Sequence, residues 1–254
     1  MTLSQKAIYD YMAIPDSCHL GKRIYKKLFH ENAKLSATDK RAFREDIDTI
    51  TWQYTLKPST IPIKPYTNKE QEYIEIAIIQ VDLRAQRHTK RIAEIIHRAI
   101  PYPLVVVFAY QSNSLLSLAT KRFSQAERGA IVVDEFFSTE WIDLSAPNAI
   151  QKEFLDSLSI STLPHSNFRA LYLALVERVV ALDCANRTGI FHLETTTARS
   201  AMRRQTLAAC RDLEARIAEE RAALKKETQF NRQVERNVRI KEIERELKLK
   251  VKKL

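Results

Sequence analysis

The 254-residue sequence predicts an α+β body, in which helices flank a mixed β-sheet, followed by a long C-terminal helical arm with coiled-coil-like spacing. Apolar, β-branched runs such as Leu104–Tyr110 are typical of buried strands. Between them stand segments with helical periodicity, such as His88–Ala99. The last glycine is Gly189, and no proline follows it, so the sequence permits uninterrupted helix from about Thr196. We therefore divide the chain into a body, 1–195, and an arm, 196–254.

The N-terminal third of the body predicts two helices and a strand. Gly21–Ala33 carries Ile24, Leu28 and Phe29 at helical spacing, and Ser36 with Asp39 is typical of a helix start. The residues from 49 to 56 alternate apolar with polar and are β-branched or aromatic, which predicts a half-buried strand. Three prolines then predict an extended connection over 57–68.

The centre of the body predicts a strand, a helix and a second strand in succession. The segment 72–83 is almost continuously apolar at its middle, which indicates burial on both faces of a sheet. His88–Ala99 places its isoleucines on one helical face, and Leu104–Tyr110 is the next buried strand. This order predicts that the two strands run parallel.

The remainder of the body predicts a hairpin and then helices. We expect strands over 115–123 and 129–137, a short continuation over 141–144, and helices over 150–158 and 167–181.

The arm predicts helix pairing. Its apolar residues recur at spacings of three and four, with Glu, Lys and Arg between them. We expect oligomerisation through Leu207, Leu213, Ile217, Leu224, Ile240, Ile243 and Leu247. The segment 225–232 interrupts this pattern, either as a stutter in one long helix or as the turn of an antiparallel helical hairpin.

The net charge of +10 is concentrated in the arm. From Arg199 onward there are 17 Lys and Arg against 9 Asp and Glu, whereas the first 198 residues carry 24 against 22. Hydrophobic residues make up 45% of the chain, which excludes a wholly disordered protein, and no apolar run is long enough to cross a membrane. The first ten residues lack the apolar core of a secretory signal.

Several classes of site are excluded by composition. The three glycines are isolated, so neither a P-loop nor a dinucleotide-binding loop is supported. The three cysteines are widely spaced, which argues against disulfides and zinc and favours a reducing cytoplasm. Cys184 lies near Arg187, which could activate a thiol, but a buried structural cysteine fits better. There is no Gly-x-Ser-x-Gly elbow, and the histidines are scattered singly. We expect no metal and no cofactor.

A metal-dependent nuclease is the enzymatic alternative. The order helix, strand, strand, helix, strand is also that of restriction-endonuclease-like cores, so the body could be a degenerate form of that fold. Such a site needs two carboxylates for Mg²⁺ and a Lys. The candidates, all in this alternative only, are Asp46, Asp48, Glu75, Asp82 and Lys90. The expected Glu-x-Lys pattern is missing, because Ala77 follows Glu75 at the second position.

Two clusters of basic residues suggest contact with nucleic acid. Clustered Lys and Arg neutralise phosphates and give salt-dependent binding, although they can also simply solubilise a surface. The candidates fall in the predicted helix 21–33 and at the junction after the strand 72–83: Lys22, Arg23, Lys26, Lys27, Arg84, Arg87, Lys90 and Arg91.

One stretch resembles a known bacterial family. The residues from His19 to Asn32, from Leu35 to Leu56 (with its run Asp-Ile-Asp-Thr-Ile-Thr-Trp), from Ser59 to Ile63 and from Tyr73 to Leu83 are similar to domain of unknown function 4391. The resemblance covers about Ile14–Ala181. It implies genes beside DNA methyltransferase and helicase or restriction-subunit genes in restriction-like or anti-phage operons. It supplies no catalytic motif.

We therefore expect a cytoplasmic, non-enzymatic accessory subunit of a DNA-targeting defence or restriction-modification complex. Its partners would be helicase or methyltransferase subunits, with a homo-oligomer through the arm and DNA at the basic residues as further expectations, and no membrane. The alternatives are the divergent Mg²⁺-dependent nuclease and a pure protein adaptor without nucleic-acid contact.

Overall fold

The computed structural model describes residues 7–33, 35–126 and 130–254. The chain folds as two compact units, Met1–Leu182 and Asp183–Leu254. The second unit includes the end of the helix Phe168–Thr188 as well as both arm helices. It therefore begins earlier in the chain than residue 196, where the sequence placed the arm.

The first unit is built around one seven-stranded sheet, in which the strand order is β1-β2-β5-β6-β7-β8 and β9 pairs with β7. Among the strands that the structure describes, β5 and β6 pair in parallel and the other neighbours in this sheet are antiparallel. The parallel pair confirms the predicted strand, helix, strand crossover. A separate pair of short strands, β3 and β4, forms a second sheet. The strands are β1 His19–Arg23, β2 Ile47–Leu56, β3 Tyr66–Thr67, β4 Glu72–Tyr73, β5 Ile76–Leu83, β6 Leu104–Tyr110, β7 Asn113–Phe123, β8 Ile131–Ser138 and β9 Ile142–Asp143.

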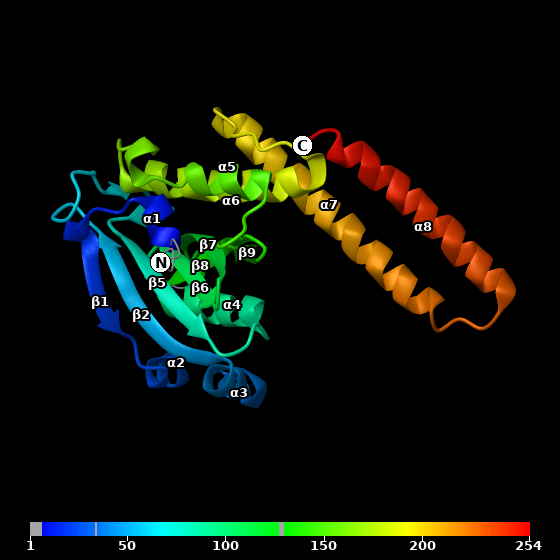
Figure 1. Ribbon diagram of the computed structural model, residues 1–254, viewed down its shortest axis with the longest axis horizontal. Helices are drawn as coiled ribbons and strands as arrows, with labels where there is room; N and C mark the ends of the chain where they lie inside the picture. The colour runs from blue at the N-terminus through cyan, green and yellow to red at the C-terminus, as the bar shows by residue number, and fades with distance from the viewer. Residues whose placement is uncertain (1–6, 34, 127–129) are drawn as a thin grey trace. The chain divides into compact units, whose positions relative to one another are not determined.

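Helices cover both faces of this sheet (Figure 1). One group, α2 to α4, packs on one face, and α5 and α6 lie on the other. The α-helices of the chain are α1 Ile8–Met12, α2 Lys27–Asn32, α3 Ala37–Glu45, α4 Thr89–Ala99, α5 Ala149–Asp156, α6 Phe168–Thr188, α7 Thr197–Leu224 and α8 Phe230–Val251, with short 3-10 turns at Asp16–Cys18 and Ile160–Thr162.

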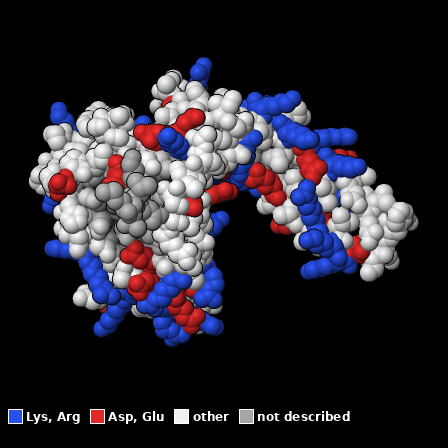
Figure 2. Space-filling model, viewed as in Figure 1, with Lys and Arg blue, Asp and Glu red and all other residues white. Residues whose placement is uncertain are grey.

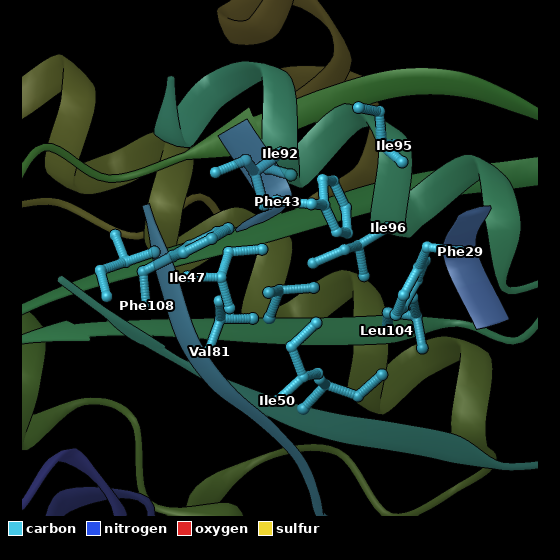
Figure 3. Close-up of a cluster of buried hydrophobic side chains, with 14 of the residues drawn as sticks. Phe29, Phe43, Ile47, Ile50, Val81, Ile92, Ile95, Ile96, Leu104 and Phe108 are labelled. Atoms are coloured by element: carbon cyan, nitrogen blue, oxygen red, sulfur yellow. The ribbon is translucent and has the colours of Figure 1, made fainter. Parts of the chain in front are cut away.

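The core under α2 to α4 is apolar and closely packed. Phe29, Phe43 and Ile96 come from these three helices and converge on sheet residues such as Ile50 and Val81 (Figure 3). All of them are almost inaccessible to solvent. Burial of apolar side chains of this size stabilises a fold by roughly 1.5–3 kcal/mol each. This core fixes the ends of β2 and β5 against the helices.

Most predicted elements are confirmed, because their signals are local. Ser36 caps α3: its hydroxyl accepts from the Asp39 amide at 3.1 Å, and the Asp39 carboxylate accepts from the Ser36 amide. The residues Ile76–Ile79 of β5 are buried throughout, as the apolar run predicted. The hairpin of β7 and β8 and the short strand β9 also form. Gly129, where the second hairpin strand was expected to begin, lies outside the described residues.

Two predictions about the body are wrong. Residues 21–33 do not form one helix: Gly21 takes a φ of +62° at an irregularity of β1, and only Lys27–Asn32 is helical. The strand predicted over 72–83 is broken between β4 and β5, because Tyr73 pairs with Tyr66 in the small second sheet. Both differences depend on which strands pair with each other, which helical or alternating periodicity does not reveal.

The second unit resolves the alternative left open for the arm. Helices α7 and α8 pack against each other, and the turn between them falls at residues 225–229, so the arm is a helical hairpin. Figure 1 shows the two helices side by side.

Candidate nucleic-acid interface

The two basic segments predicted from the sequence meet at one end of the sheet. In the antiparallel pair β1–β2, Arg23 lies opposite Thr51, and in β2–β5, Ile47 lies opposite Leu83. Strands β1 and β5 therefore both run toward the start of β2: β5 ends opposite its first residue and β1 opposite its fifth. We call this surface the basic end. It consists of Lys22, Arg23, Lys26, Lys27, Arg84, Arg87, Lys90 and Arg91.

The basic end is visible on the surface of the first unit. Lys and Arg gather around α2 and α3, with Asp and Glu between them (Figure 2). The first four residues of the basic end do not lie on the single helix 21–33 that the sequence predicted. Lys22 and Arg23 belong to β1, Lys26 precedes α2 and Lys27 begins it. Arg84 and Arg87 follow β5, and Lys90 and Arg91 lie in the first turn of α4.

Three of the arginines are held by carboxylates. Arg91 donates two hydrogen bonds to Asp39, at 2.8 and 2.9 Å, and this contact lowers the pKa of the buried Asp39 carboxyl. Arg87 pairs with the buried Asp46 at 3.0 Å. Arg84 pairs with the half-exposed Asp48 at 2.7 Å. These arginines brace α3 and β2 against the segment that follows β5, so only part of their charge is available to a ligand.

The lysines of the basic end are less constrained. Lys22 and Lys90 are exposed and make no ion pair with any described residue, and Lys27 contacts Glu31 at 3.3 Å with its own side chain 82% exposed. Lys26 donates to the carbonyl of Ile47 at 2.5 Å. Burial lowers the pKa of Lys26, and the neighbouring Arg84 lowers it further. An approaching anion would relieve this crowding of positive charge.

A cavity of about 210 Å³ opens beside these lysines. Its lining comes from the end of β1, the start of α2 and the start of β2: Arg23, Ile24, Tyr25, Lys26, Lys27, Asp48, Thr49 and Ile50. Three cations and one carboxylate face it, and Arg84 already pairs with that carboxylate.

The residues of the nuclease alternative do not assemble a metal site. Asp46 is engaged by Arg87 and by the His88 ring, whose Nδ1 lies 2.6 Å from its carboxylate. Asp82 accepts hydrogen bonds from Thr49 and from the Gln80 amide. Within 7–33, 35–126 and 130–254, no three His, Cys, Asp or Glu side chains are placed to hold a metal ion.

Asp48 pairs with Arg84, and Glu75 lies far from Asp82. Glu75 precedes β5, whereas Asp82 is near its end, a separation of roughly 20 Å along a strand. Glu75 and Asp82 are therefore too far apart to share one Mg²⁺ ion. Lys90 is exposed on α4.

A polar group on the sheet was missed by the sequence reasoning. Asp82, Gln80 and Thr49 form one hydrogen-bonded group, and the buried hydroxyl of Tyr9 makes no hydrogen bond with any described residue. Burial raises the pKa of Tyr9, and Tyr54 and Asp82 raise it further. Gln80 and Tyr9 line a cavity of about 200 Å³ beside the turn from β6 to β7. The signal was present as two polar residues inside an otherwise apolar strand.

Most of the residues predicted for oligomerisation are buried or partly buried within the helical hairpin of the second unit. Leu213 and Ile217 of α7 pack with Ile240 and Ile243 of α8, and Leu224 and Leu247 extend this cluster. Leu207 is also buried, with 2% of its surface exposed. Arg236 and Arg239 both pair with Glu220 across the two helices. The apolar residues of the arm are therefore covered largely by contacts between α7 and α8 of the same chain.

Other apolar residues of α8 remain exposed. Phe230, Val234 and Val238 lie four residues apart, so they share one side of the helix. Their exposed fractions are 74%, 46% and 52%. We call them the α8 stripe.

Comparison with known families places the chain. A family model described as "Domain of unknown function (DUF4391)" matches residues 12–247. The chain belongs to the DUF4391 family. The resemblance seen in the sequence reached Ala181. The family model extends it through most of α8. The comparisons with curated proteins and with solved structures return no match.

Two further predictions from the sequence concern the cysteines and the absence of a membrane-spanning segment. Cys18, Cys184 and Cys210 are unpaired and buried, and burial raises the pKa of Cys184 to about 12, with Asp183 adding to the effect. Cys184 is therefore a packing residue and not an activated thiol. Within the described part of the chain, every helix is too short or too polar to cross a membrane.

Proposed function

We propose that this DUF4391 protein is a non-catalytic subunit that contacts the phosphate backbone of nucleic acid through its basic end and binds protein partners through its arm. The observation that carries the proposal is the meeting of two basic segments, about sixty residues apart in the sequence, at one end of the sheet. Exposed lysines beside arginines that are braced by carboxylates supply the positive potential that attracts phosphates.

We base a proposal about the complex in which the protein acts on the sequence resemblance. The resemblance described from the sequence implies neighbouring DNA methyltransferase and helicase genes, so we propose a subunit of a bacterial restriction-like or anti-phage complex that acts on DNA. Three unpaired cysteines fit a reducing compartment, and we propose the cytoplasm. The α8 stripe supports docking of a protein partner, because exposed apolar residues at helical spacing are typical of helix-pairing surfaces.

A binding titration tests the nucleic-acid contact. The triple variant Lys22→Ala, Lys27→Ala, Lys90→Ala removes three exposed cations from the basic end. A fluorescein-labelled DNA duplex, followed by anisotropy in about 50 mM salt, should bind this variant roughly tenfold or more weakly than the unchanged protein.

The matched control removes the same charge elsewhere in the first unit. Lys57, Lys64 and Lys69 are also exposed, and they lie outside the basic end. Their triple alanine variant should retain most of the affinity. If the unchanged protein binds no duplex even at low salt, nucleic-acid contact is contradicted and the protein-adaptor alternative is favoured.

A further inference from the structure

Tyr25 is an exposed aromatic residue within the basic end. It lies between β1 and α2 with 67% of its surface accessible, more than any other described tyrosine. Aromatic side chains usually bury most of their large apolar surface. The guanidinium of Arg23 lies over the ring at 5.9 Å from its centroid. A flat ring next to a cation is the arrangement that proteins use to stack bases of unpaired nucleic acid.

The ring forms part of the cavity described at the basic end, which we call the Tyr25 pocket. Ile24 and Ile50 add apolar surface to its lining, Thr49 adds a hydroxyl, and Arg23, Lys26 and Lys27 add positive charge. Its volume of about 210 Å³ exceeds the roughly 150 Å³ of an engineered cavity that binds benzene, so it has room for a planar ring.

The arrangement of charge favours an anion attached to that ring. Arg23 and Lys27 carry positive charge at the pocket, while Asp48 is engaged by Arg84 at 2.7 Å. A nucleotide has both parts that such a site selects: a flat base and a phosphate. A duplex offers only the phosphate at its backbone, because its bases are stacked inside.

We propose that the Tyr25 pocket binds an unpaired nucleotide, so that the basic end prefers single-stranded to duplex nucleic acid. The base stacks on Tyr25, and the flanking phosphates contact Arg23 and Lys27. This proposal rests on the nucleic-acid contact proposed above and names the form of nucleic acid that is bound.

Three variants of the full chain test the role of the ring. The probes are a fluorescein-labelled oligo(dT) of about 15 nucleotides and a DNA duplex of the same length, followed by anisotropy. Tyr25→Ala should weaken oligo(dT) binding about tenfold, which corresponds to about 1.4 kcal/mol, and should change duplex binding less than about twofold. Tyr25→Phe retains the ring and should bind like the unchanged protein. Tyr102→Ala removes another exposed tyrosine, outside the pocket, and should also have no effect.

An abasic probe makes the test independent of any loss of folding. Oligo(dT) in which abasic sites replace the bases keeps every phosphate, so the unchanged protein should bind it about tenfold more weakly than oligo(dT). Tyr25→Ala should bind the two probes equally, because it has no ring on which a base can stack. Unchanged affinity of Tyr25→Ala for oligo(dT), or equal losses for duplex and oligo(dT), would overturn the stacking proposal while leaving the proposed nucleic-acid contact intact. If neither oligo(dT) nor duplex binds to the unchanged protein, both proposals fail.

Discussion

His97 lies in the last turn of α4 with its ring almost fully buried in the first unit. Its Nε2 is 3.1 Å from the hydroxyl of Ser117. Burial lowers the pKa of His97 to about 3, and the nearby Lys121 lowers it further. Lys121 is itself buried: it donates to the carbonyls of Ile100 and Tyr102 beyond the end of α4, and burial lowers its pKa to about 7. Of these two groups, His97 makes the fold sensitive to acid, because the pKa of Lys121 changes only between about 10.5 and about 7.

The sensitivity to acid is predicted to reside largely in His97. In the unfolded chain a histidine binds a proton near pH 6.5, whereas the folded protein keeps His97 neutral until about pH 3. The free energy of unfolding should therefore fall as the pH falls from about 6.5 to about 3, by up to roughly 1.4 kcal/mol per pH unit from this group. His97→Gln should lessen this dependence.

Urea unfolding at several pH values measures this effect. The fluorescence of Trp52 and Trp141 reports on the body, because both pack against its core. His192→Gln changes an exposed histidine and serves as the control. Equal pH dependence in His97→Gln and the unchanged protein would contradict the assignment.

The two ion pairs of Arg91 and Arg84 are predicted to differ in their effect on stability. Removing Arg91 leaves the Asp39 carboxylate, which is 5% exposed, without its main partner. Arg91→Ala should lower the free energy of unfolding by about 2 kcal/mol. Arg84→Ala affects a half-exposed pair and should cost less than about 1 kcal/mol. Chemical denaturation of both variants checks this order, and equal losses would show that Arg91 is not a brace.

At the scale of elements, local sequence signals predicted where helices and strands form. They predicted less well which of these elements contact each other. The capping residues Ser36 and Asp39 are three apart and were recognised, because the cap is a local structure. The basic residues were also recognised, but their meeting depends on the pairing of β1, β2 and β5, which spans over sixty residues. The brace between Asp39 and Arg91 joins α3 to α4 and gave no sequence signal. The interruption at 225–232 marked the hairpin turn, yet the same spacing also fitted one long helix.

The hairpin of the second unit is predicted to depend on its inner residues. Ile243→Ala removes a side chain that is 5% exposed and packs between α7 and α8, so it should destabilise the hairpin by roughly 2–4 kcal/mol. Val238→Ala lies in the exposed α8 stripe and should change stability by less than about 0.5 kcal/mol. Thermal unfolding followed by circular dichroism compares the two variants. Similar losses from both would contradict the inward and outward assignment of these residues.

For the molecule as a whole, the position of the charge matters more than its sum. The net charge of +10 lies mostly in the arm, where Arg236 and Arg239 share the single carboxylate of Glu220 between the helices. The first 198 residues are almost neutral, yet their surface carries the basic end. Most of the excess charge is therefore in the arm, whereas the pairing of β1, β2 and β5 gathers basic residues on the body.

Assembly through the arm is predicted to use the α8 stripe. The triple variant Phe230→Ser, Val234→Ser, Val238→Ser leaves the hairpin core unchanged, so it should remain helical and lose self-association or partner binding. Light scattering gives the mass of the protein alone and with its co-purified partners. Unchanged mass and unchanged partner binding would contradict docking through this stripe.

The salt dependence of DNA binding tests most directly the claim that the basic end contacts phosphates. Each lysine that contacts a phosphate contributes about 0.9 to the slope of log K against log salt concentration. The variant Lys22→Ala, Lys27→Ala, Lys90→Ala should therefore lower the slope by up to about 3, whereas Lys57→Ala, Lys64→Ala, Lys69→Ala should leave it unchanged. A slope that falls equally in both variants, or in neither, would contradict the account.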